Sequence, residues 1–244
     1  MTSLYAWPDL FRRLAALAGA CLLSACTVTY QFAPIEAWVV DAETGKPIEG
    51  AVVTANWELV KGSFDGPRYY GQLEVKETVT DAKGRFAFEG FSKEDSSGAE
   101  LRESDPQILI FKAGHKFERF TNDYRDGGAG MTRMYRTAAV NGKTVKLHKN
   151  TMEKDQIRRA HTHLILSLGF LNKIMPHTNE SEKCYWQKIP RMLRETKIQE
   201  NSMKRSGIDP SSMYMHLIAN NDQYAANAKV QCISPKELFV EEVK

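Results

Sequence analysis

The sequence has no long apolar run after its first 25 residues, so it offers no internal candidate for a membrane-spanning helix. The longest such run, Leu164–Leu171, has eight residues and is interrupted by Ser167 and Gly169. A helix needs about 20 mostly apolar residues to cross the ~30 Å hydrocarbon core of a bilayer. Any membrane attachment is therefore expected at the N-terminal end.

An excess of charge of either sign is also lacking. The chain has 33 basic and 30 acidic side chains, a formal net charge of +3 at pH 7. We find no basic stripe with interleaved aromatic residues, the pattern that nucleic-acid-binding proteins present to phosphates and bases. We therefore expect no nucleic acid as a partner.

The common signatures of catalysis are missing as well. There is no Gly-x-Ser-x-Gly elbow, no P-loop and no Gly-x-Gly-x-x-Gly. His161 and His163 stand two residues apart on an expected helix, about 200° around its axis, so they cannot share one metal ion. We interpret His161 as a hydrogen-bonded core residue. The sequence predicts a protein that is not an enzyme and that needs no metal and no cofactor.

Cysteine is scarce, and two of the four cysteines lie in the first 26 residues. Arg12 and Arg13 precede Leu14–Ala25, in which every residue is apolar or small. Twelve helical residues cover about 18 Å at 1.5 Å each, which is too short to span a bilayer. A basic start, a brief apolar run and a small-residue exit are typical of a secretory signal peptide over residues 1–25.

The exit Leu23-Ser24-Ala25-Cys26 resembles the bacterial lipobox. The resemblance implies cleavage before Cys26, a diacylglycerol on its sulfur and an acyl chain such as palmitate on the new amino group. Thr27 follows where an aspartate would favour the inner membrane, so the analogy implies an outer-membrane lipoprotein, on the periplasmic face or the cell surface. The alternative is an ordinary signal whose cleavage site adjoins a cysteine. We expect residues 26–33 to be the lipidated cysteine and a tether.

Cys184 and Cys232 are the thiols that remain after lipidation. Export would deliver them to an oxidising compartment, where two cysteines most simply form a disulfide. Closing that ~49-residue loop would contribute about 4 kcal/mol in the chain-entropy model. Two separate buried thiols are the alternative.

Residues 34–150 show the period of strands. Val53, Ala55, Trp57 and Leu59 alternate onto one face, as in a half-buried strand. The turn Asp81–Gly84 offers a glycine for a positive φ angle between two further strands. The nearly continuous apolar segment 107–114 is expected to be central in its sheet.

Three segments of this half match, in order, the carboxypeptidase regulatory-like domain: "DAETGKPIEGAVV", "TDAKGRF" and "FKAGH". The resemblance implies a transthyretin-like antiparallel β-sandwich of about seven strands. Its motifs serve turns and core, so it implies a scaffold without a defined chemistry. The first segment also resembles 5-hydroxyisourate hydrolases, but Ala37 and Trp38 stand where those enzymes have a histidine. Zinc carboxypeptidases carry such a sandwich too, yet no His-x-x-Glu ligand pair is present.

Residues 151–244 show the period of helices instead. We expect helices over about 153–175 and 181–207, with Pro190 breaking or kinking the second and Gly207 ending it. Two more are expected to start at Asp209-Pro210 and Ser234-Pro235. The predicted fold class is α+β, a β-sandwich followed by a C-terminal helical domain.

Function is expected in the loops of the sandwich and in the helical domain. Aromatic and arginine side chains suit contact with a protein or a glycan. The candidate binding residues are Phe64, Arg68, Tyr69, Tyr70, Tyr124 and Arg125. We predict a lipid-anchored, non-enzymatic binding or structural module of the bacterial envelope, whose partners are the membrane and an envelope protein or glycan. The alternative is a periplasmic hydrolase or metal-dependent enzyme with a site between sandwich and helices.

Overall fold

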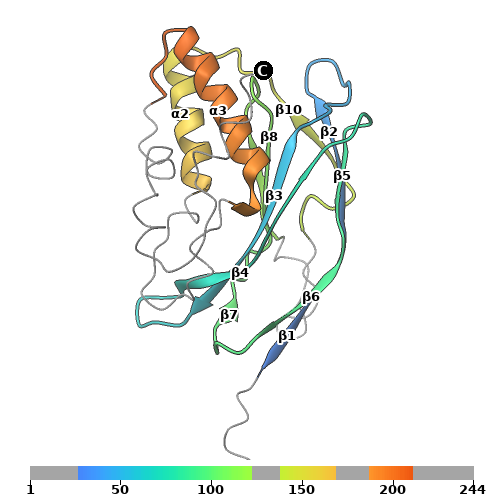
Figure 1. Cartoon of the computed structure of the whole chain (residues 1–244), viewed down its shortest axis with the longest axis vertical. Helices are drawn as coiled ribbons and strands as arrows, with labels where there is room; N and C mark the ends of the chain where they lie inside the picture. Colours follow the sequence, from blue (N-terminus) through green and yellow to red (C-terminus); the bar gives the residue numbers. More distant parts are fainter. Residues whose placement is uncertain (1–26, 123–137, 169–186, 211–244) are drawn as a thin grey trace, which may run out of the picture.

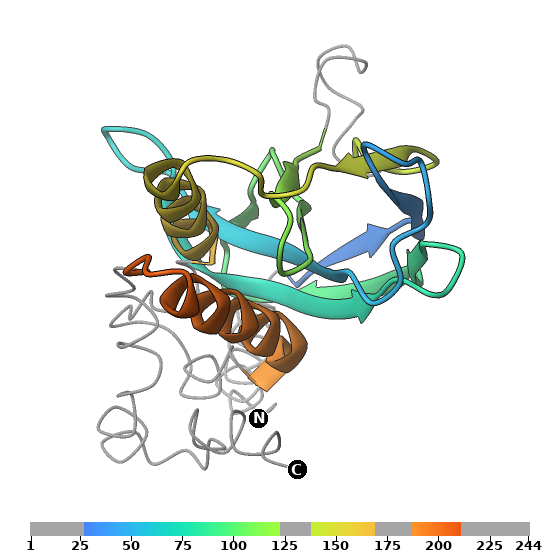
Figure 2. The ribbon, with the colours of Figure 1, turned by 90° about the horizontal axis from the view of Figure 1, so that it is seen from above.

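The computed structural model describes residues 27–122, 138–168 and 187–210. These parts of the chain hold ten strands and two helices, arranged as two β layers and one helical layer (Figures 1 and 2). The predicted α+β class is confirmed at this level.

The first layer consists of two small sheets that continue one another. Its strands are β1 (Val28–Phe32), β2 (Ile35–Asp41), β5 (Arg85–Phe88), β6 (Phe91–Asp95) and β10 (Thr144–Leu147). β1 pairs with β6, and the order in the other sheet is β10-β2-β5. The chain passes from β1 to β2 beside Pro34 and from β5 to β6 beside Gly90. A Cβ atom on Gly90 would lie 2.9 Å from the carbonyl oxygen of Phe32, so only glycine lets the two connections approach this closely.

The second layer is a five-stranded sheet with β3 and β8 in its interior. Its strands are β3 (Val52–Lys61), β4 (Arg68–Val79), β7 (Glu100–Leu101), β8 (Gln107–Phe111) and β9 (Glu118–Phe120). The order is β4-β3-β8-β9, and β7 also pairs with β3. The predicted central position of the segment that begins at Gln107 is therefore confirmed.

The main core lies between the two β layers. Val53, Ala55, Trp57 and Leu59 of β3 face it, as the alternation predicts, together with Ile108 and Ile110 of β8. Trp57 is 1% exposed and lies edge-on to Phe91, at 5.0 Å between ring centroids. These contacts join the two layers into a sandwich.

The sandwich departs from the expected strand pattern in three respects. The described residues hold ten strands rather than about seven, and one pair is parallel, since β10 runs beside β2 with Thr144 opposite Trp38. The expectation of an antiparallel sandwich is wrong for that pair. β1 also occupies most of the segment expected to be a tether, because Val28–Phe32 pairs with β6 in full register.

Helices α2 (Lys154–Ser167) and α3 (Pro190–Arg205) form the third layer and cover the outer face of the five-stranded sheet (Figure 2). A second apolar cluster joins them to it. Its members are Val52, Val75, Leu109, Phe111, Leu164, Ile165, Leu168, Ile189, Met192 and Leu193. β3 and β8 are thus buried on both faces, which explains the nearly continuous apolar sequence of β8.

Both ends of α3 follow local rules. Pro190 is its first residue, where the missing N–H costs nothing, so within the described residues this proline marks a helix start, in agreement with the expected break. Gly207, at a φ of +67°, follows the last turn. The amide of Ile208 donates to the carbonyl of Met203 and that of Gly207 to Lys204, the two bonds of a Schellman motif. The prediction that Gly207 ends this helix is confirmed.

Several predicted features lie outside the described residues. They are the signal peptide, Cys26, Tyr124, Arg125, Cys184, Cys232 and the two helices expected after residue 210.

Candidate functional site

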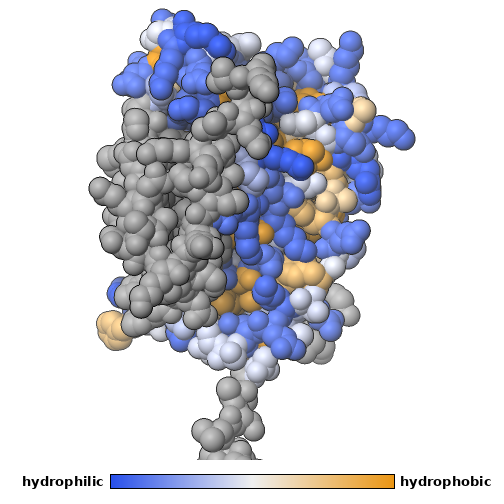
Figure 3. Space-filling model, in the orientation of Figure 1, coloured by the Kyte–Doolittle hydropathy of each residue, from blue (hydrophilic) through white to orange (hydrophobic). Residues whose placement is uncertain are grey.

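The hairpin between β3 and β4 carries the most exposed aromatic side chain in the described parts of the chain. The two strands pair from Val52 opposite Val79 to Lys61 opposite Arg68, and residues 62–67 close the hairpin. Phe64 lies in this loop and is fully exposed. In Figure 3 an apolar group projects at the lower left, where Figure 1 shows this loop. A long, well-paired hairpin thus presents one aromatic ring to solvent.

The polar groups of the hairpin hold its shape. Arg68 Nη2 lies 2.6 Å from Asp65 Oδ2, and the Ser63 hydroxyl donates to the same carboxylate. The Arg68 guanidinium, followed by the Ser63 hydroxyl, lowers the pKa of Asp65 below its usual value. On the other strand, the ammonium of Lys61 lies 3.8 Å above the ring of Tyr70. The strand ends that flank the loop of Phe64 therefore carry two cationic groups.

The structure separates the four predicted hairpin residues into two roles. Phe64 and Arg68 are exposed and available for contact. Tyr69 and Tyr70 are partly buried, with Tyr70 packed against the main core and the Tyr69 hydroxyl within 3.3 Å of Gln72 Nε2. Phe64 and Arg68 therefore remain candidates for contact, whereas Tyr69 and Tyr70 support the hairpin.

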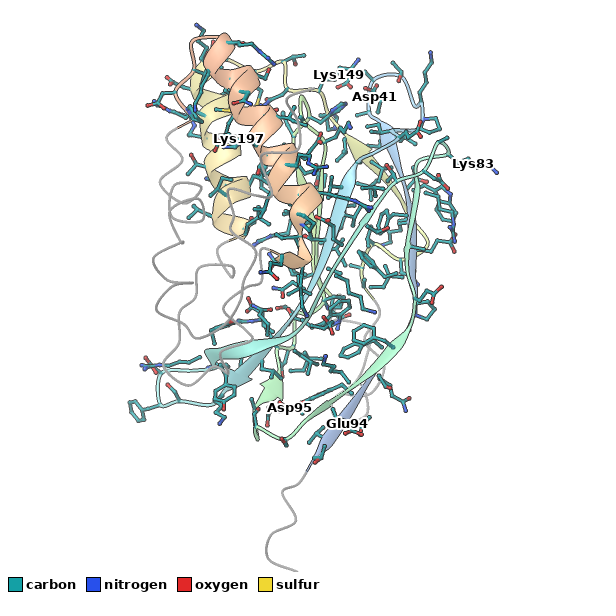
Figure 4. All side chains as sticks on the ribbon, in the orientation of Figure 1. Asp41, Lys83, Glu94, Asp95, Lys149 and Lys197 are labelled. Atoms are coloured by element: carbon teal, nitrogen blue, oxygen red, sulfur yellow. The ribbon has the colours of Figure 1, made fainter. Side chains whose placement is uncertain are left out.

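The start of β1 supplies a second exposed apolar group. Among the described residues, the exposed large apolar side chains are Val28, Phe64, Leu166 and Ile198. Val28 pairs with Asp95, which Figure 4 places at the lower end of the molecule. Figure 1 shows the loop between β3 and β4 toward that same end.

A polar seam docks α3 on the sheet, and no sequence pattern indicated it. The carboxylate of Glu77 on β4 accepts the amides of Arg191 at 3.0 Å and Met192 at 2.7 Å, at the first turn of α3. Burial raises the pKa of Glu77. The hydrogen bonds from the amides of Met192 and Arg191 lower it again, but only in part. Further along α3, Glu195 accepts the amide of Ala113 and Gln199 that of Gly114, both at 2.7 Å.

Two histidines line a small cavity between the sheet and the helices. Its free interior is about 10 Å³, the space of a single water molecule. His161 Nε2 lies 3.4 Å from Glu200 Oε1, and His115 Nε2 lies 3.7 Å from Asp41 Oδ2. The interpretation of His161 as a buried, hydrogen-bonded residue is confirmed, since it is 3% exposed. Two imidazoles on buried carboxylates could orient a water, but the space does not admit a substrate.

Asp41 organises the turn after β2 at the opposite end from β1, near Lys149 (Figure 4). Its Oδ1 accepts the Thr44 hydroxyl at 2.8 Å and the Thr44 amide at 2.7 Å. The Thr44 hydroxyl, its amide and the charge of Lys149 lower the pKa of Asp41 to about 2. These contacts describe an Asx-type turn whose role is structural.

Within residues 27–122, 138–168 and 187–210, no group of three His, Cys, Asp or Glu side chains is placed to hold a metal ion. In the same parts of the chain, neither helix has the length and apolar character needed to cross a bilayer.

Comparison with known proteins gives only distant structural likeness. No protein-family model and no curated protein matches the sequence. A streptococcal ancillary pilin aligns over 49% of this chain and 30% of its own, at 15% identity and a TM-score of 0.22. A 9R-lipoxygenase from Cyanothece PCC8801 aligns over 62% of this chain and 25% of its own, at 11% identity and a TM-score of 0.24. The chain is a β-rich protein with sandwich-like sheets and a helical layer, and it spans less than a third of either structure.

Proposed function

We propose that this chain is a lipid-anchored protein of the bacterial outer membrane that acts as a non-enzymatic binding or structural module. The support begins with the lipobox-like Leu23-Ser24-Ala25-Cys26. The sandwich would be a carboxypeptidase regulatory-like, transthyretin-like scaffold. Its contacts with the envelope would come from the exposed hairpin residues Phe64 and Arg68 and from the helical layer.

One observation carries the proposal beyond the sequence. β1 begins at Val28, two residues after Cys26. An extended residue spans about 3.3 Å, so the anchor and the first strand would be about 7 Å apart. A module held this close to its lipid anchor works at the membrane surface, as an accessory part of an assembly there, rather than at long range.

The anchor is tested by changing Cys26 to Ser. We expect loss of radiolabelled palmitate incorporation, accumulation of the uncleaved precursor and loss of the mature chain from outer-membrane fractions. Serine at the neighbouring Thr27 is the matched control and should leave all three unchanged. If the Cys26→Ser protein matures normally and is recovered with membranes, the proposed lipidation at Cys26 is wrong.

A second candidate function is a periplasmic hydrolase or metal-dependent enzyme with its site between sheet and helices. The observation in its favour is the pair of His115 and His161, each beside a carboxylate, on one interlayer cavity. The small size of that cavity is why we rank this function second. Elemental analysis of the purified chain and a hydrolase substrate panel separate the two functions. Stoichiometric zinc that His161→Ala removes would favour the enzyme.

A further inference from the structure

We propose that the hairpin between β3 and β4 is a second membrane contact, with Phe64 seated in the interfacial region of the bilayer. The ammonium of Lys61 and the guanidinium of Arg68 would lie at the level of the lipid phosphates. This names the partner of the hairpin as the lipid surface and rests on the lipid anchor proposed above.

The placement of the hairpin is the first argument. Val28, next to the proposed anchor, pairs with Asp95 at the lower end of the molecule in Figure 4. The hairpin loop points toward the same end in Figure 1, whereas Figure 2 shows it well to one side of β1. An anchor at one point and a hairpin at another give two separated contacts, which together fix the tilt of the sandwich on a flat surface.

The chemistry of the loop is the second argument. Phe64 is fully exposed at the tip, with Arg68 and the partly buried Tyr69 and Tyr70 behind it. Aromatic rings at the headgroup level, with basic side chains reaching the phosphates, are the usual composition of membrane interfaces. Both side chains of the Arg68–Asp65 ion pair are exposed to solvent, and such a pair contributes little to stability. The guanidinium can therefore exchange the carboxylate for a lipid phosphate at little cost in free energy.

The anchor explains why one aromatic residue suffices. A single weak membrane signal binds only marginally, and stable attachment takes two. Tethering at Cys26 would keep the hairpin at a high effective concentration next to the bilayer, so a weak contact becomes well populated. Glu94 and Asp95 lie at the same end and repel anionic lipid, so the contact depends more on the ring than on charge.

The test places a tryptophan at the hairpin tip of the intact, acylated protein. Phe64→Trp is inserted into preformed vesicles of phosphatidylethanolamine and phosphatidylglycerol, with and without lipids brominated near the top of the acyl chain. The matched control is Lys83→Trp, an exposed position in the turn before β5 that Figure 4 shows at the other end of the molecule. The wild-type chain supplies the background from its own tryptophans.

We expect the added emission of Phe64→Trp to shift to shorter wavelength and to fall at least twofold in brominated vesicles, whereas Lys83→Trp is unaffected. The quenching should persist when phosphatidylglycerol is replaced by phosphatidylcholine and when salt is raised. Flotation of the vesicles reports the anchor separately. Protein that floats but shows equal, weak quenching at both positions overturns the membrane contact and leaves the hairpin to a protein or glycan. Protein that is not acylated and does not float overturns the anchor, and the inference with it.

Discussion

The carboxylate of Glu77 offers a direct test of how the helical layer is attached to the sandwich. It accepts the amides of Arg191 and Met192, two of the donors that the first turn of any helix leaves without an intrahelical partner. Because Glu77 belongs to β4, these bonds join residues more than a hundred positions apart. We predict that Glu77→Ala destabilises the fold measurably and that Glu77→Gln does so less.

The magnitude follows from the two amides. Loss of a helix N-cap costs about 1 kcal/mol, and leaving a buried donor without an acceptor costs about 1–3 kcal/mol. The raised pKa of Glu77 shows that its ionised form is penalised by burial, so removing the charge recovers part of that loss. We expect about 2 kcal/mol for alanine and about half of that for glutamine, whose amide oxygen still accepts one bond.

Urea unfolding followed by circular dichroism measures this difference. For a chain of this size, about 2 kcal/mol corresponds to roughly 4–8 °C in the melting temperature. Glu49→Ala, at an exposed position on the same sandwich, is the control and should stay within about 0.5 kcal/mol of wild type. A Glu77→Ala midpoint equal to that of Glu49→Ala would refute the reasoning, and would leave the apolar cluster alone to hold α3.

The pKa of Asp41 is lowered to about 2 from 3.8, so its carboxylate stabilises the fold above about pH 4 and loses that effect as the pH falls toward 2. Asp41→Asn should therefore melt below wild type at pH 6, and this gap should close between pH 4 and pH 2 in thermal scans. Replacing His161 by alanine leaves a void beside the buried Glu200, which keeps the ammonium of Lys197 at 3.5 Å. It should cost about 2 kcal/mol in urea unfolding, mainly through the lost packing, whereas an effect below about 0.5 kcal/mol would show that His161 does not stabilise this layer. Mass spectrometry of the unreduced, digested protein should show a peptide linked through Cys184 and Cys232, with an alkylatable thiol at both positions as the contrary result.

The parts of the fold that were predictable are those in which local periodicity and burial agree. β3 alternates because one face meets the main core, and its apolar Val53 and Trp57 follow a period of two. The turn before β5 contains Gly84 at a φ of +72°, which a tight connection requires. The end of α3 follows from Gly207 for the same reason.

The rest depends on contacts that no local pattern encodes. Residues 26–33 were expected to be a tether, and only the pairing of Val28–Phe32 with β6 makes most of that segment a strand. The parallel pairing of β10 with β2 brings together segments about a hundred residues apart. No sequence pattern marked Glu77, since its role exists only once α3 lies across β4. The amino-acid composition of the hairpin loop was predictable, but the exposure of each of its side chains was not. The sequence shows that the loop is rich in aromatic residues. Which of their rings is exposed depends on the packing of Tyr70 against the main core.

The short distance between the proposed anchor and β1 would restrict the orientation of the sandwich. A lipidated cysteine on a long flexible linker would leave the orientation of its domain free, whereas β1 starts two residues after Cys26 and is paired along its whole length with β6. Any force on the anchor would pass directly into the first β layer and, through Trp57 and its neighbours, into the second. The end of the sandwich near Val28 would then face the bilayer, and the end near Asp41 would face away from it. Under that geometry, the exposed apolar side chains divide between two tasks. Val28 and Phe64 would lie toward the membrane-facing end, while the exposed Leu166 and Ile198 of the helical layer would be available to the proposed envelope partner.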